Sequence, residues 1–153
     1  HREIDDRERA YCPDCERVLW RTAVPGVAVA VVDDGRVCCI RRGQPPAEGA
    51  WALPGGHPEH DESLAAGAAR ELEEETGLRV DPDDLEPIRT RLSTGPERNH
   101  ASVHFAASRE AATGDPVAGD DAAAVAFLTP SAYDDREALR HDNPTLDDAI
   151  ERF

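Results

Sequence analysis

The chain has 153 residues, enough for one domain with a single hydrophobic core and few for two. It carries 32 acidic against 17 basic residues, a formal net charge of −15, and every basic residue is Arg. This charge repels a nucleic-acid duplex, and no run approaches the roughly 20 apolar residues of a membrane span. We therefore expect no nucleic-acid duplex and no membrane as partner, and a cytoplasmic protein.

Two cysteines mark the polar N-terminal segment. Cys12 and Cys15, two residues apart, have the spacing of one half of a zinc knuckle. A second such pair is absent, and Cys38 and Cys39 are neighbours on an expected strand, where their side chains point to opposite faces. Structural Zn²⁺ on Cys12 and Cys15 would need a histidine such as His1, missing N-terminal residues or a second subunit. The alternative is a degenerate or partial knuckle without metal.

Apolar runs between turn residues predict the elements that follow. Strands are expected at 27–32 and 37–40 around the hairpin turn Asp33-Asp34-Gly35, at 88–92, at 101–107 and at 122–128, where alanines leave a helix open. Helices are expected at 131–139 and 145–152. Strands on either side of one central helix indicate an α/β sandwich, with an N-terminal segment over 1–21 and a domain over 22–153.

The central helix is expected to begin near Glu62 or Ser63, after the breaker cluster Pro54-Gly55-Gly56, and to end at Gly77. At about 100° per residue, Glu71, Glu74 and Glu75 fall within roughly a 100° arc, next to an apolar flank. Three carboxylates one turn apart repel each other, and a hard cation such as Mg²⁺ or Mn²⁺ relieves this best. A solvated acidic helix face is the alternative.

Nine residues of this region share one spacing. They satisfy the pattern G-x5-E-x7-R-E-(aliphatic)-x-E-E-x-G-(aliphatic), so the chain resembles the Nudix hydrolases. The lead-in over 49–56 is similar to the G-x-W-x-L-P-G-G run of many Nudix domains, and residues 119–122 resemble their late acidic loop. The nine are Gly56, Glu62, Arg70, Glu71, Leu72, Glu74, Glu75, Gly77 and Leu78.

The resemblance implies a Nudix-type α/β/α sandwich with a mixed sheet and a central catalytic helix. It implies metal-assisted attack of water on a pyrophosphate bond of a nucleoside diphosphate derivative. The general base is either a helix glutamate or one of the loop residues Asp120 and Asp121. A nucleotide-binding module without catalysis is the alternative. In family terms, the metal ligands map onto Glu71, Glu74, Glu75 and the Gly55 carbonyl, Glu62 supports them, and Arg70 orients them.

The resemblance does not identify the substrate, which is ADP-ribose, another nucleotide sugar or a nucleoside triphosphate. Pro96 lies 19 residues after Gly77, near but not at the proline position expected of ADP-ribose pyrophosphatases. His57, His60, His100 and His104 can each contact a phosphate or base, with a surface or capping position as the alternative. Many relatives in the family are dimers, so the resemblance allows a homodimer, while the sequence itself does not determine the oligomeric state.

The acidic, lysine-free composition resembles a haloarchaeal proteome. Self-repulsion from such a charge weakens the compact state in dilute buffer and is screened at high salt. A GC-rich genome that favours Arg over Lys is the alternative. We therefore expect a halophilic protein whose activity depends on salt and on bound cations.

Overall fold

A computed structural model describes residues 1–95 and 97–153. Pro96 lies outside the described residues. The N-terminal strands are β1 (Arg2–Ile4), β2 (Arg7–Cys12) and β3 (Arg17–Leu19). The domain has β4 (Val24–Asp33), β5 (Arg36–Arg42), β6 (Trp51–Ala52), β7 (Gly55–Gly56), α1 (Leu64–Thr76), η1 (Pro82–Asp84), β8 (Glu86–Ser93), β9 (His100–Ser108), η2 (Arg109–Ala111), β10 (Ala122–Leu128), α2 (Pro130–Asp134) and α3 (Pro144–Arg152).

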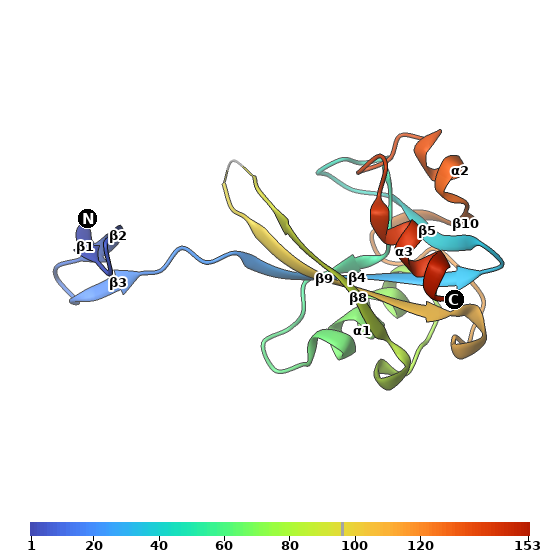
Figure 1. The fold of residues 1–153 in the computed structure, drawn as a ribbon, viewed down its shortest axis with the longest axis horizontal. Coiled ribbons are helices and arrows are strands. Elements are labelled where there is room, and N and C mark those ends of the chain that lie inside the picture. The colour runs from blue at the N-terminus through green and yellow to red at the C-terminus, as the bar shows by residue number, and fades with distance from the viewer. Residues whose placement is uncertain (96) are drawn as a thin grey trace.

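The strands form two sheets. The seven-stranded sheet has the order β10-β5-β4-β9-β8, with β6 on β5 and β7 on β4. It is mixed, because β4 and β9 run parallel while the other pairs are antiparallel. The three-stranded sheet β1-β2-β3 stands apart at the end of an extended stretch of chain (Figure 1). The sequence did not predict strands in this polar segment.

Strand β4 explains how one sheet supports two layers. Its residues alternate between the two faces, so Val27, Val29 and Val31 pack with Leu72 of α1. Ala30 and Val32 pack on the opposite face, with residues of α2 and α3. A strand buried on both faces reads as a continuous apolar run, which is what the sequence shows. The predicted α/β sandwich with a mixed sheet is confirmed.

The ends of the central helix follow its sequence signals. The Ser63 hydroxyl accepts a hydrogen bond from the Ala66 N–H at 3.1 Å, which caps the first turn of α1. Gly77 closes the helix in the left-handed conformation, with φ 71°, and its N–H donates to the Glu73 carbonyl. Both predicted ends are confirmed.

Two expected elements differ in type or length. Residues 122–128 form a strand paired with β5, so the helical alternative is wrong. The helix expected over 131–139 ends at Asp134. Beyond it, the Trp51 N–H donates to the Glu137 carbonyl and the Leu139 N–H to the Trp51 carbonyl, both at 2.7 Å. These backbone bonds hold the chain extended beside Trp51 and leave no partners for a helix.

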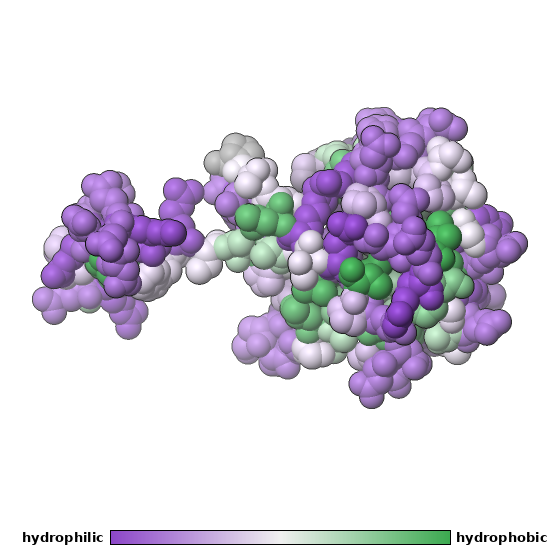
Figure 2. All heavy atoms as spheres, viewed as in Figure 1, coloured by the Kyte–Doolittle hydropathy of each residue, from purple (hydrophilic) through white to green (hydrophobic). Residues whose placement is uncertain are grey.

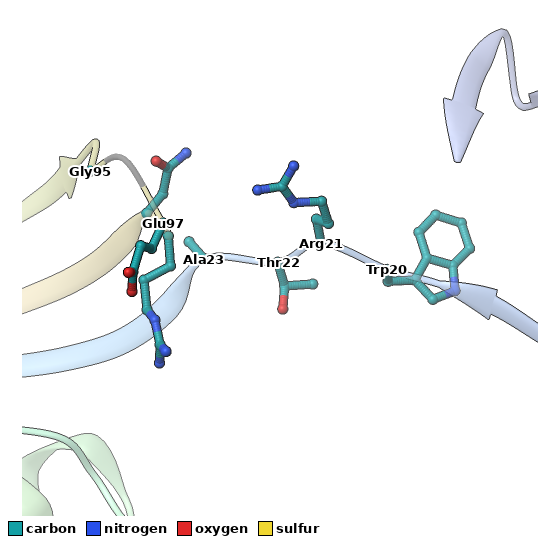
Figure 3. Close-up of a pocket in the computed structure, with 8 residues that line it drawn as sticks. Trp20, Arg21, Thr22, Ala23, Gly95 and Glu97 are labelled. Atoms are coloured by element: carbon teal, nitrogen blue, oxygen red, sulfur yellow. The ribbon is translucent and has the colours of Figure 1, made fainter. Parts of the chain in front are cut away.

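The surface reflects the composition. Hydrophilic residues cover most of the face seen in Figure 2. Among the described residues, no helix combines the length and the apolar character needed to cross a bilayer. Between the small sheet and the domain, the stretch from Trp20 to Ala23 borders a hollow of about 460 Å³ opposite Gly95 and Glu97 (Figure 3). None of the residues lining this hollow belongs to the predicted site.

Candidate active site

Arg70 holds three of the predicted acids together. Its guanidinium donates to both carboxylate oxygens of Glu62, at 2.8 and 3.3 Å, and to Glu71 and Glu74 at 3.0 Å each. It also donates to the His57 carbonyl at 3.0 Å. The hydrogen bond from Arg70 keeps the pKa of Glu62 below its ordinary value, and Glu62 in turn raises the pKa of Arg70. One cation thus offsets much of the repulsion between the carboxylates.

Glu75 differs from the other acids because it is buried, with 6% of its surface exposed. One carboxylate oxygen accepts the Gly55 N–H at 2.8 Å. Burial raises its pKa to about 7, and the charges of Glu71 and Asp120 act in the same direction. The Gly55 N–H and Arg42 oppose the rise. A buried carboxylate of this kind is stabilised in its charged form by a nearby cation.

The two glycines before the helix lie in close contact with their surroundings. A Cβ on Gly55 would overlap the Val27 carbonyl oxygen, and one on Gly56 would lie 2.5 Å from a Glu71 carboxylate oxygen. Strand β7, formed by these glycines, pairs with β4 and brings the backbone against the carboxylates. A side chain at position 55 would therefore clash with the backbone of β4, and one at position 56 would displace the Glu71 carboxylate.

The late acidic loop is fixed from two sides. The Gly119 N–H donates to the Glu75 carbonyl at 3.1 Å. On the other side, the Gly43 N–H donates to the Asp121 carbonyl at 2.7 Å, and the Gln44 amide donates to the Asp121 carboxylate. Sequence reasoning missed Gln44, because nothing in a loop before two prolines signals a contact 77 residues away.

These elements enclose a cleft of about 400 Å³. Arg42 and His57 line it beside the acids; sequence reasoning did not single out Arg42, although it ends a predicted strand. Glu62 and Arg70 do not line it. His100 stacks on His57, with ring centroids 5.5 Å apart. The residues singled out from the sequence that line the cleft are Gly55, Gly56, His57, Glu71, Glu74, Glu75, Asp120 and Asp121.

The cleft offers the donors that a hard cation prefers. Its carboxylate oxygens, with the Gly55 backbone beside them, suit Mg²⁺ or Mn²⁺ better than softer metals. Within residues 1–95 and 97–153, no group of three His, Cys, Asp or Glu is already close enough to hold a metal ion. Arg70 explains this spacing, because it lies between the carboxylates of Glu71 and Glu74. The donor set fits the cation if Arg70 releases its hydrogen bonds to Glu71 and Glu74.

The cysteines form no complete site in the part of the chain that the structure describes. Hydrogen bonds from Cys15 and from the Asp14 backbone lower the pKa of Cys12, which favours the thiolate. No third ligand joins Cys12 and Cys15 among the described residues, so zinc stays a prediction. Cys38 and Cys39 are buried on opposite faces of the sheet, as predicted.

His104 does not lie at the cleft or on the surface. It is buried on the other face of the sheet, so the capping or surface position expected for it is wrong. His60, in contrast, is exposed beside Asp61.

Comparison with known families decides the identity of the fold. A family model described as the NUDIX domain matches residues 22–149. The chain belongs to the Nudix family. It is accordingly a Nudix pyrophosphohydrolase, and the resemblance drawn from the nine residues is confirmed.

Three relatives show the range of this similarity. The Nudix chain is 35% identical over 120 residues to a MutT-like protein of Streptomyces ambofaciens, covering 78% of this chain and 71% of that protein. It is 32% identical over 106 residues to an ADP-ribose pyrophosphatase of Methanocaldococcus jannaschii, covering 68% of this chain and 62% of that protein. The NUDIX domain of Shewanella oneidensis NrtR, solved with ADP ribose, has a TM-score of 0.70 at 20% identity, covering 93% of each chain.

Proposed function

We propose that this Nudix protein uses Mg²⁺ or Mn²⁺ to hydrolyse the pyrophosphate bond of a nucleoside diphosphate derivative. The observation that carries the proposal is the convergence of Glu71, Glu74 and buried Glu75 on one cleft. Without a cation, three carboxylates would repel the diphosphate they face. When bound, the cation would offset that charge and lower the pKa of the attacking water.

Each side chain has a proposed part in this reaction. Glu71, Glu74, Glu75 and the Gly55 carbonyl are the proposed cation ligands. Arg70 and Glu62 are positioning residues, because neither lines the cleft: Arg70 donates to the ligands Glu71 and Glu74, and Glu62 accepts from Arg70. Arg42 lines the cleft and offers a guanidinium to phosphate oxygens.

The proton of the attacking water has two proposed acceptors. Glu75 is one, because its buried carboxylate lines the cleft. Asp120 is the other, since it lines the same cleft on a loop that is fixed to α1 and to residues 43 and 44. Variants Glu75→Gln and Asp120→Asn, compared by pH–rate profiles at saturating Mg²⁺, separate the two. Loss of the acidic limb in only one of them identifies the acceptor.

ADP-ribose is the first substrate to test. It is supported by the name of the archaeal relative and by the ligand of the structural relative. The panel should also hold other nucleoside diphosphate sugars and nucleoside triphosphates. Release of phosphorylated products is measured with Mg²⁺ or Mn²⁺ in high salt, for the wild type, Glu74→Gln and Glu73→Gln.

Glu73→Gln is the matched control because Glu73 is exposed on the same helix and pairs with Arg79 instead of lining the cleft. We expect turnover by the wild type and by Glu73→Gln, and a loss of at least 100-fold in Glu74→Gln. A wild type that binds nucleotides without turnover would instead support the binding module. Light scattering on the same sample determines whether the protein is a monomer or a homodimer.

A further inference from the structure

The loop that follows β5 meets the late acidic loop beside the cleft. It consists of residues 43–50. Two backbone bonds close its base: the Arg42 N–H donates to the Ala50 carbonyl at 2.9 Å, and the Gly49 N–H donates to the Arg42 carbonyl at 2.8 Å. Gln44 lies near the start of this loop, is exposed, and does not line the cleft. It is therefore no candidate for a direct contact with the substrate or the cation.

The late acidic loop contains a tight turn. The Ala122 N–H donates to the Gly119 carbonyl at 3.0 Å, so Asp120 and Asp121 are the two central residues of a turn over residues 119–122. Asp120 has a φ of 46°, which lies in the left-handed region. A residue with a Cβ adopts this region at some cost, even an aspartate, so contacts from outside the turn help to hold its shape.

Gln44 connects the two loops. Its side-chain amide donates to the Asp121 carboxylate, and the Gly43 N–H beside it donates to the Asp121 carbonyl at 2.7 Å. Within the described part of the chain, no side chain donates to the Asp120 carboxylate, which lines the cleft. The two neighbouring aspartates thus differ: Asp121 is held by the loop over 43–50, whereas Asp120 is left to face the cleft.

The position of Asp120 is opposed by the acids of the cleft. Helix α1 presents three carboxylates to the same space, and the charge of Asp120 raises the pKa of Glu75, so these groups are near enough to act on each other. Repulsion between like charges favours a turn that moves outwards into solvent. A hydrogen bond from Gln44 on the other side of the turn resists this movement.

We propose that Gln44 is a positioning residue, which holds the turn over 119–122 so that the Asp120 carboxylate stays at the cleft. The inference rests on the function proposed above, because the contact affects turnover only if Asp120 takes part in the reaction. It also separates the two aspartates that the sequence left as equal candidates. Asp121 is the anchor of the turn, and Asp120 is the residue that acts in the cleft.

Exchanging the donor and the acceptor tests this contact. Gln44→Glu places two carboxylates opposite each other and breaks the hydrogen bond. The double variant Gln44→Glu/Asp121→Asn again places an amide opposite a carboxylate, with both side chains unchanged in length and the net charge unchanged. Glu48→Gln is the control, because Glu48 is exposed on the same loop and does not line the cleft.

The first measurement is amide hydrogen exchange at Ala122 in EDTA, which needs neither metal nor substrate. The Ala122 N–H is bonded within the turn, so its exchange rate reports how often the turn opens. We expect Gln44→Glu to raise this rate about three- to tenfold, the double variant to return it to within about twofold of the wild type, and Glu48→Gln to leave it unchanged. An unchanged rate in Gln44→Glu would overturn the proposal.

The second measurement is turnover of the substrate identified with the nucleotide panel. We expect kcat to fall about three- to tenfold in Gln44→Glu at an unchanged KM, and the double variant to recover most of this loss. A loss that the double variant does not recover would show that the Asp121 carboxylate acts directly. Faster exchange at an unchanged kcat would show that the contact only stabilises the loop. Either result overturns the proposal.

Failure of the proposed function gives a different result. A wild type that turns over no nucleotide refutes hydrolysis without reference to any Gln44 variant. The exchange rates at Ala122 then still decide whether Gln44 fixes the turn, because they are measured on the metal-free protein.

Discussion

The buried carboxyl of Glu75 makes the stability of the metal-free protein depend on pH. Glu75→Gln replaces it with an amide of the same shape that still accepts the Gly55 N–H through its oxygen. A pKa of about 7 in the folded protein, against an ordinary value of 4.5, corresponds to roughly 3 kcal/mol. Because only 6% of the Glu75 surface is exposed, solvent screens little of this effect.

The direction follows from proton binding. The folded state holds the Glu75 proton more tightly than the unfolded state, so the free energy of unfolding falls as pH rises from about 4.5 to about 7. Above pH 7 the full penalty remains. In Glu75→Gln, which has no ionisable group at this position, the free energy of unfolding does not fall in this way. It should therefore match the wild type near pH 4.5 and exceed its stability by up to roughly 3 kcal/mol at pH 8.

Urea unfolding monitored by circular dichroism, in EDTA and constant high NaCl from pH 4.5 to 8, measures the difference. Other titrating groups, including His104, are common to both proteins and cancel in it. Glu73→Gln is again the control and should show a pH-independent difference. A constant offset between wild type and Glu75→Gln over the whole range would refute the reasoning. Saturating Mg²⁺ should reverse the order at pH 8, because binding stabilises only the protein with the complete ligand set.

Three further changes test the structure around the site by the same unfolding assay. Gly55→Ala should cost about 1–3 kcal/mol, because the new methyl group meets the Val27 carbonyl; an unchanged midpoint would contradict that close approach. Ser63→Ala should cost about 1 kcal/mol by removing the cap of α1, whereas Ser63→Asp should retain it; equal losses would show that the cap does not contribute. Raising NaCl from dilute buffer to about 1 M, where the screening length is about 3 Å, should stabilise the wild type because the net charge is −15. A flat response to salt would argue against the halophilic expectation.

The helix and its carboxylates could be predicted because their information is local. Ser63 and Gly77 are strong end signals, and the helical period alone brings Glu71, Glu74 and Glu75 to one side. The buried state of Glu75 was not predictable in this way. It depends on Gly55, which approaches only because β7 pairs with β4.

Contacts between segments that are distant in the sequence could not be predicted from the sequence. The bond from Gln44 to Asp121 joins two loops that are brought together by the pairing of β5 with β10. His104 was misplaced for a related reason. Both faces of β9 are buried, so the apolar pattern does not show which face a histidine occupies.

The parallel pairing of β4 with β9 has a consequence for how the protein is made. It joins Val24 to His100, so one edge of β4 has no partner until the ribosome has added a further 76 residues, up to His100. At roughly 5–20 residues per second, this takes about 4–15 s. During that time the nascent chain exposes a strand edge that other chains can pair with. Residues 1–100 carry 21 acidic and 13 basic residues, a net charge of −8, and this charge keeps newly synthesised copies apart while that edge is open.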